Sequence, residues 1–168
     1  MKKLILSLML ITATSVIYSQ SKKQDNKMET SVNKEITLNL SRAIMTGQWD
    51  KVDALLDDNF KYIGDGRPAM NKQEYIGFMR NVLCSAMTDM DMKFMRVIEE
   101  GAMVAVDYTN DMTNSGNFMG IPATGKRVVA TGQFIREIKN GKVVAEWQTT
   151  NGYGLMVQLG VIPAPQGK

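Results

Sequence analysis

The apolar residues of this chain change their spacing near residue 87, and this change constrains the fold more than any other feature. Before it, apolar residues recur every three or four positions, which is the period of an amphipathic helix. After it, Met90, Met92 and Phe94 alternate with polar residues, which is the period of a strand. Helices followed by strands predict an α+β fold, with the helices packed on one face of a curved antiparallel sheet.

Three helices are predicted in the first half of the chain. The first covers residues 28–45, and a short second helix follows from Trp49 to Leu56. Asn71 is predicted to cap the third, because Glu74 stands three residues later and completes a capping box. A short strand and turn are expected between the second and third helices, in the stretch "NFKYIGDG".

The second half predicts a meander of long strands. The alternation slips by one position after Phe94, which indicates a β-bulge. Asn140-Gly141 separates two alternating runs and is a strong signal for a two-residue hairpin. Beyond the strand that begins near residue 87, strands are predicted at residues 103–114, 128–138 and 143–150.

The first residues are typical of a signal peptide. Lys2 and Lys3 precede an apolar run over residues 4–16, and Ser19 offers a small residue for cleavage. An uncleaved anchor is the alternative, although the run is short for a membrane span. The mature protein is therefore expected to be exported, periplasmic or secreted, and soluble without stable membrane insertion. The predicted segments are a signal peptide (1–19), a tether (20–27), one domain (28–163) and a tail (164–168).

Charge and residue usage limit the chemistry. The chain has 20 basic and 17 acidic residues, and loss of Lys2 and Lys3 with the signal peptide leaves 18 against 17. This balance does not favour a nucleic-acid partner. Cys84 is the single cysteine, so no disulfide forms within the chain, and the sequence has no histidine to act as a base or metal ligand.

Three motifs near the C-terminus carry a family resemblance. "NFMGIPATGKRV", "GKVVAEW" and "GLMVQLGVIP" follow one another between Asn117 and Pro163, and the chain resembles the SnoaL-like polyketide cyclase family, also called ester cyclase-like. This family is part of the nuclear transport factor 2-like superfamily. The resemblance implies a cone-shaped α+β barrel, three N-terminal helices on the concave face of the sheet, and often a homodimer packed through the sheet. It also implies a small apolar ligand in the cone and no metal or organic cofactor.

The positions that the resemblance assigns to proton transfer hold neutral residues. The family histidine falls on Asn114, the carboxylate on the next strand falls within Val128–Thr131, and an aspartate after the last long strand falls on Asn151. General acid–base catalysis needs a group that gains and loses a proton near the working pH, and an amide does not. An amide can instead hold a ligand oxygen through its N–H donors.

Strand alternation predicts which side chains face the cone. Tyr108, Asn110, Met112 and Asn114 share one face of their strand, and Asp107 points to the other. On the last strand, Trp147 is expected inside and Glu146 outside, because burial of an unpaired charge is costly.

The leading hypothesis is a domain that binds a small, largely apolar molecule. The residues expected to contact that molecule are Tyr108, Asn110, Met112, Asn114, Trp147, Asn151, Met79 and Phe134. One alternative is a cofactor-independent cyclase, isomerase or hydrolase that uses a non-standard carboxylate, with Asp65 and Asp107 as candidate catalytic residues. Another is a protein-interaction module whose cone is filled by its own methionines.

Overall fold

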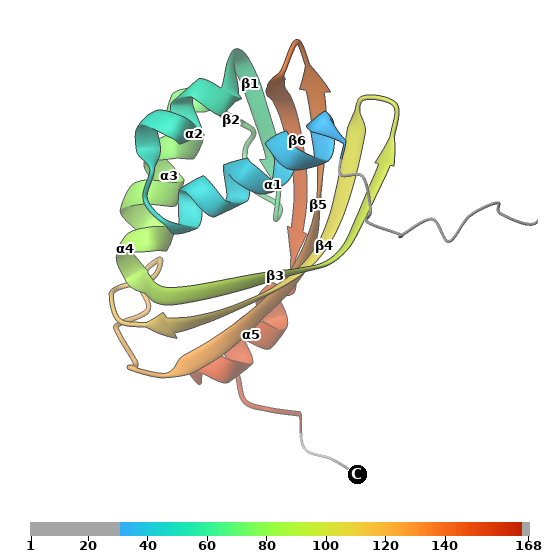
Figure 1. The fold of residues 1–168 in the computed structure, drawn as a ribbon. Helices are drawn as coiled ribbons and strands as arrows, with labels where there is room; N and C mark the ends of the chain where they lie inside the picture. Colours follow the sequence, from blue (N-terminus) through green and yellow to red (C-terminus); the bar gives the residue numbers. More distant parts are fainter. Residues whose placement is uncertain (1–30, 166–168) are drawn as a thin grey trace, which may run out of the picture.

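The computed structural model describes residues 31–165, which form a strongly curved sheet with helices in its concavity (Figure 1). The α+β class and the cone shape are therefore confirmed. The signal peptide and tether predicted for residues 1–27 lie outside the described residues, as do residues 166–168. Among residues 31–165, no helix combines the length and apolar character required to cross a membrane.

The predicted helices are present, with changes at their ends. Helix α1 spans Val32–Met45 and is capped by the preceding Ser31. Helix α2 spans Trp49–Leu55. The third predicted helix is a continuous helical run of three parts: α3 (Lys72–Phe78), a π-helical turn (Met79–Leu83) and α4 (Cys84–Ala86). Asn71 and Glu74 form the predicted capping box at its start.

The sheet has six strands in the order β2-β1-β6-β5-β4-β3. The four strands from β3 to β6 form the predicted antiparallel meander, and β1 joins it by pairing parallel with β6. The strand bounds are β1 Leu56–Gly64, β2 Met70–Asn71, β3 Met87–Glu100, β4 Met103–Asn114, β5 Arg127–Lys139 and β6 Lys142–Thr150.

Register irregularities curve the sheet. The pairing of β3 with β4 shifts between Phe94 and Arg96, where the sequence predicted a bulge. The β5–β6 hairpin turns at Asn140 and Gly141, whose φ angles are 51° and 76°, as the Asn-Gly pair requires for a tight turn. A further shift lies between Glu137 and Ile138 in this hairpin, and it decides which side chains of β6 face the cone.

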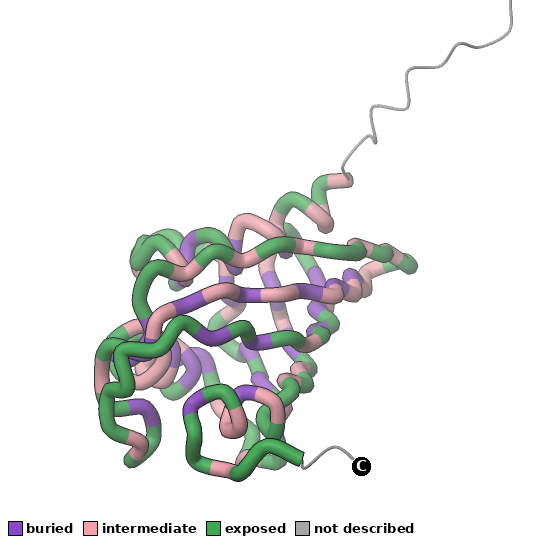
Figure 2. Tube along the Cα trace, turned by 90° about the horizontal axis from the view of Figure 1, so that it is seen from below, coloured by how far each residue is buried: buried purple, intermediate pink, exposed green. Residues whose placement is uncertain are grey.

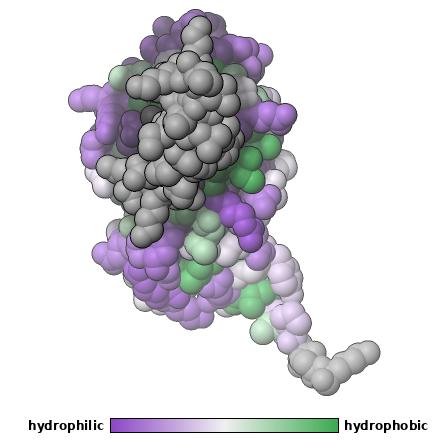
Figure 3. All heavy atoms as spheres, turned by 45° about the vertical axis from the view of Figure 1, so that its right-hand side comes forward, coloured by the Kyte–Doolittle hydropathy of each residue, from purple (hydrophilic) through white to green (hydrophobic). Residues whose placement is uncertain are grey.

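The concave face of the sheet carries the core. Buried and accessible residues alternate along the strands, as Figure 2 shows, and the buried set packs against α1 and the α3–α4 run. On the face shown in Figure 3, hydrophilic residues predominate and hydrophobic residues reach the surface in patches. The helices therefore cover the concave face while leaving a cavity between themselves and the sheet.

Helix α5 (Gly152–Leu159) closes the end of the sheet where β6 stops. Its Gln158 side chain accepts a hydrogen bond from the Val129 backbone N–H (2.8 Å) and donates one to the Val129 carbonyl (2.9 Å). Gln158 thereby pairs the backbone N–H and carbonyl groups of Val129, in the part of β5 that extends beyond its neighbour β6. Leu155 and Leu159 of the same helix pack onto the concave face.

Candidate functional site

A cavity of about 480 Å³ lies between the helices and the concave face of the sheet. This volume is within the range of small-molecule sites, and most of the lining is apolar. Methionines contribute to the lining without filling the space, so the expectation of a cone filled by its own methionines is wrong. The methionines that line it are Met45, Met79, Met90, Met92, Met112, Met119 and Met156.

Five of the eight residues expected to contact a ligand line this cavity. Tyr108, Asn110 and Met112 do so because alternate residues of β4 point inward, and all three are buried. Phe134 reaches the cavity from β5, and Met79 reaches it from the helical run. The alternation of residues along β4 therefore predicted which of its side chains point to the concave face of the sheet.

Asn114 and Asn151 lie outside the cavity lining and have partners within the protein. Asn114 is fully buried, accepts hydrogen bonds from the Thr124 N–H (2.8 Å) and hydroxyl (2.9 Å), and donates to the Gly116 carbonyl (2.9 Å). It therefore holds the loop that joins β4 to β5. Asn151 caps α5 by accepting a hydrogen bond from the Gly154 N–H at 2.9 Å.

The expected orientations of Glu146 and Trp147 are wrong. Glu146 is fully buried, and Trp147 is 37% exposed on the convex face, where it pairs with Ile135. The register shift in the hairpin inverts the alternation, so that Ala145 and Glu146 are both buried. The cost of burying the charge of Glu146 is offset because its partner is the buried Arg136.

The two candidate carboxylates occupy different environments. Asp65 lines the cavity, in a turn where its φ angle is 52°. Its two carboxylate oxygens accept hydrogen bonds from the N–H (2.7 Å) and the hydroxyl (3.2 Å) of Thr150. Asp107 is absent from the lining and forms an ion pair with Arg96 at 2.9 Å. Asp65 is the only carboxylate among the lining residues.

A polar cluster connects Asp65 to the tyrosine of β4. The Tyr108 hydroxyl lies 3.3 Å from the Thr150 hydroxyl, and the Gln148 amide donates to both at 3.1 Å. Tyr108 reaches across β5 to make these contacts because its cross-strand neighbour there is Gly132. A Cβ at Gly132 would lie only 2.7 Å from the Tyr108 hydroxyl.

The buried tyrosines are held in their protonated form. Burial raises the pKa of Tyr108, and burial together with the negative charge of Asp65 raises the pKa of Tyr62. Burial, followed by the negative charge of Glu146, raises the pKa of Tyr75 well above its ordinary value. These phenols are therefore neutral near pH 7 and serve as hydrogen-bond donors or acceptors.

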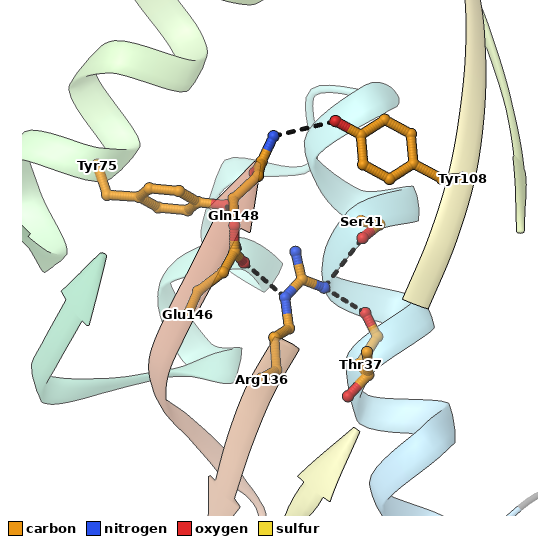
Figure 4. A network of polar contacts seen from close by, with 7 residues as sticks. All are labelled: Thr37, Ser41, Tyr75, Tyr108, Arg136, Glu146 and Gln148. Atoms are coloured by element: carbon orange, nitrogen blue, oxygen red, sulfur yellow. Dashed lines mark hydrogen bonds and ion pairs between the residues drawn. The ribbon is translucent and has the colours of Figure 1, made fainter. Parts of the chain in front are cut away.

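A buried ion pair between Arg136 and Glu146 lies at the cavity wall, to which Arg136 belongs, and Figure 4 shows its contacts. The Nε of Arg136 donates to a Glu146 carboxylate oxygen at 2.6 Å, and the Tyr75 hydroxyl lies 3.3 and 3.4 Å from the two oxygens of that carboxylate. The Nη1 of Arg136 donates to the Ser41 hydroxyl (2.9 Å) and to the Thr37 carbonyl of α1. The pair thus joins α1, α3, β5 and β6.

Asn110 stands out because its side chain has no partner among the described residues. It is 5% exposed, it lines the cavity, and its Oδ1 atom is buried without a hydrogen bond. Buried polar groups are nearly always paired, so an unpaired amide at a cavity wall marks a place where a ligand or water completes the bonding.

Sequence reasoning missed Arg136, Glu146, Tyr75 and Gln148. A partial signal for the first two was present, since a two-residue turn at Asn140-Gly141 brings Arg136 within one position of Glu146 on the opposite strand. The contacts of Tyr75 and Gln148 depend on packing between distant segments and leave no local pattern.

Among residues 31–165, no group of three or more His, Cys, Asp or Glu side chains is placed to hold a metal ion.

The fold and its cavity define a cone of the nuclear transport factor 2-like type, and comparison with known proteins identifies the family. The sequence model of the SnoaL-like polyketide cyclase family matches residues 34–159, and the chain belongs to this family. No curated protein matches the chain.

Solved structures share the fold at low sequence identity. A putative hydroxylase, AclR, from Streptomyces galilaeus has a TM-score of 0.73 and 22% identity, covering 82% of this chain and 86% of its own. A putative SnoaL-like polyketide cyclase from Jannaschia sp. CCS1 has a TM-score of 0.72 and 22% identity, covering 83% and 99%. An LEH-like epoxide hydrolase from M. tuberculosis has a TM-score of 0.63 and 18% identity, covering 79% of this chain and 92% of its own. These similarities concern the fold.

Proposed function

We propose that this domain binds a small, largely apolar molecule in its cone, with neutral residues at the family's acid–base positions. The observation that carries the proposal is the unpaired amide of Asn110 in the wall of a mostly apolar cavity. The apolar lining favours a ligand of low polarity, and the amide offers one directed hydrogen bond. Tyr108, Met112, Met79 and Phe134 complete the proposed contacts.

Titration with the neutral fluorophore N-phenyl-1-naphthylamine tests this proposal. The purified protein should bind one molecule with a saturable rise in fluorescence. Ala130 lines the cavity, and the neighbouring Thr131 is exposed, so Ala130→Phe should abolish the signal and the matched control Thr131→Phe should keep it. A signal that does not saturate, or that survives in Ala130→Phe, contradicts binding in the cone.

A catalytic role for Asp65 is the second candidate function. It is favoured because Asp65 is the only carboxylate lining the cavity and its orientation is fixed by two bonds from Thr150. In this role Asp65 takes a proton from the carbon next to a ligand carbonyl, leaving an enolate, and then returns the proton. Exchange of the methyl protons of 2-acetylnaphthalene in D₂O, followed by NMR, should then exceed the buffer rate and be lost in Asp65→Asn. Exchange at the buffer rate contradicts this role.

Export and self-association are also part of the proposal. The charged start, apolar run and small residue within positions 1–19 support a cleaved signal peptide and an exported domain. A row of apolar residues crosses the convex face through paired positions, which supports a homodimer packed through the sheet. The row consists of Ile63, Trp147, Ile135, Ala105 and Ile98.

Two measurements test these assignments. Sequencing the N-terminus of protein recovered outside the cytoplasm should find Gln20 first. Sedimentation velocity should give a dimer for the wild type and a monomer for Ile135→Glu, which places a charge in the exposed row. A wild-type monomer at micromolar concentration contradicts the proposed dimer.

A further inference from the structure

Arg136 presents an unused donor to the cavity. Its side chain is 3% exposed, and the Nε and Nη1 atoms are occupied by Glu146, Ser41 and the Thr37 carbonyl. Among residues 31–165, the side-chain hydrogen bonds of Arg136 all come from Nε and Nη1, which leaves Nη2 without a protein partner. Figure 4 shows this nitrogen pointing away from those partners, toward the side of Gln148 and Tyr108. Since Arg136 belongs to the cavity lining, the free N–H groups are available to a ligand.

The orientation of this donor is fixed before any ligand arrives. Three partners on α1 and β6 hold the guanidinium, and the Phe134 ring stacks on it with 4.3 Å from the guanidinium carbon to the ring centroid. A held donor loses little freedom on binding, and a hydrogen bond from a charged donor is stronger than one from a neutral group.

The charged residues around the cavity favour an uncharged ligand. The charged residues in the lining are Asp65, Arg67 and Arg136, and Glu146 lies directly behind Arg136. Their formal charges cancel. A ligand carboxylate at Nη2 would place a second negative charge beside the fully buried Glu146, and the single positive charge of Arg136 is already paired with Glu146. An uncharged acceptor uses the same donor without that penalty.

We propose that the ligand is an uncharged molecule with a carbonyl oxygen, as in a ketone, ester or lactone, and that this oxygen accepts a hydrogen bond from Nη2 of Arg136. This inference rests on the proposed function, because it specifies the chemistry of the molecule in the cone. It assigns Arg136 as a binding residue at a position that the sequence resemblance did not indicate.

Three naphthalenes of similar shape test the assignment: 2-acetylnaphthalene with a carbonyl, 2-ethylnaphthalene with a methylene in its place, and 2-naphthoate with a carboxylate. Wild-type protein should bind the ketone about tenfold more tightly than the hydrocarbon, the effect of one charge-assisted hydrogen bond. Binding of the carboxylate should be the weakest. Isothermal titration calorimetry measures all three.

Two variants locate the carbonyl site. Arg136→Met with Glu146→Leu removes the ion pair as a unit, so that no buried charge is left alone, and it should reduce the preference for the ketone to about twofold or less. Asn110→Leu tests the competing assignment, because loss of the preference in this variant would place the carbonyl at Asn110 instead. Thr131→Leu changes an exposed residue on the outward face of β5, and this control should keep the preference. If the double variant does not fold, the infrared stretch of carbonyl-¹³C-labelled 2-acetylnaphthalene in the wild-type protein decides. It should shift to lower frequency than in an aprotic solvent.

The outcomes distinguish a failure of the proposed function from a failure of the Arg136 assignment. If none of the naphthalenes binds, the proposed function fails, and this inference fails with it. If the ketone and the hydrocarbon bind equally, or the carbonyl stretch is unshifted, the domain is still a binder but Arg136 is not its anchor. Loss of the preference in Asn110→Leu moves the carbonyl to Asn110, and tighter binding of the naphthoate overturns the assignment of an uncharged ligand.

Discussion

Gly132 is a position where a single added methyl group should destabilise the fold. A Cβ at this residue of β5 would lie 2.5 Å from the Thr149 carbonyl oxygen and 2.7 Å from the Tyr108 hydroxyl. The first contact falls about 0.9 Å short of the 3.4 Å at which ordinary contacts begin. Gly132→Ala must therefore displace the backbone of β6, the Tyr108 side chain, or both.

The expected cost follows from these contacts. Overpacking of this kind costs about 1–3 kcal/mol, and loss of the bonding between Tyr108 and Gln148 adds about 1 kcal/mol. The lower entropy of the unfolded chain with alanine offsets about 0.5 kcal/mol of this loss of stability. We therefore expect Gly132→Ala to lower the free energy of unfolding by about 1.5–3.5 kcal/mol.

Urea unfolding followed by circular dichroism measures this change. With a slope of about 2 kcal/mol per molar urea, the midpoint should fall by about 1–2 M. Gly77→Ala is the matched control, because Gly77 lies in α3 with no atom within 4 Å of its added Cβ. That variant should gain up to about 1 kcal/mol from the higher helix propensity of alanine. A Gly132→Ala midpoint equal to that of the wild type would refute the reasoning.

Three further predictions concern the buried polar groups. Asn110→Leu should raise the free energy of unfolding of the unliganded protein by about 1 kcal/mol, measured by urea, because no hydrogen bond is lost and an unpaired amide is removed. Tyr75→Phe should lower it by about 1–3 kcal/mol in the same assay, because Glu146 loses a hydroxyl partner. Burial raises the pKa of Tyr62 and Tyr108 above the ordinary value of 10.0, so the stability from their protonated forms is complete below that pH. It is lost as the pH rises from about 10 toward the raised values, and a Tyr108→Phe variant should show a shallower loss between about pH 9 and 11.

Local patterns predicted the parts of the fold that local interactions determine. The capping box at Asn71, the limits of β4 and the Asn140-Gly141 turn each follow from a few adjacent residues, and the structure confirms them. The parallel pairing of β1 with β6 has no such signal, because it depends on how the sheet curls around the helices.

The candidate site was likewise predictable only where strand pairing is regular. Strand alternation identified the inward face of β4, including Asn110 and Tyr108, because β4 pairs with β5 without a break. It failed on β6, where one register shift exchanged the faces of Glu146 and Trp147. An extra residue in a ladder changes the facing of every residue beyond it, and no residue type in the hairpin marks that insertion.

The parallel pairing of β1 with β6 affects the order in which the strands of the sheet can form during folding. Besides the two-residue strand β2, the sole sheet neighbour of β1 is β6, and the contact of Asp65 with Thr150 joins positions 85 residues apart. A ribosome must therefore complete β6 before the N-terminal helices and β1 can dock on a finished sheet. Contacts between segments so far apart in the sequence are typical of slow folding. We therefore expect the cone to close late, when the last strand is added beside one of the first.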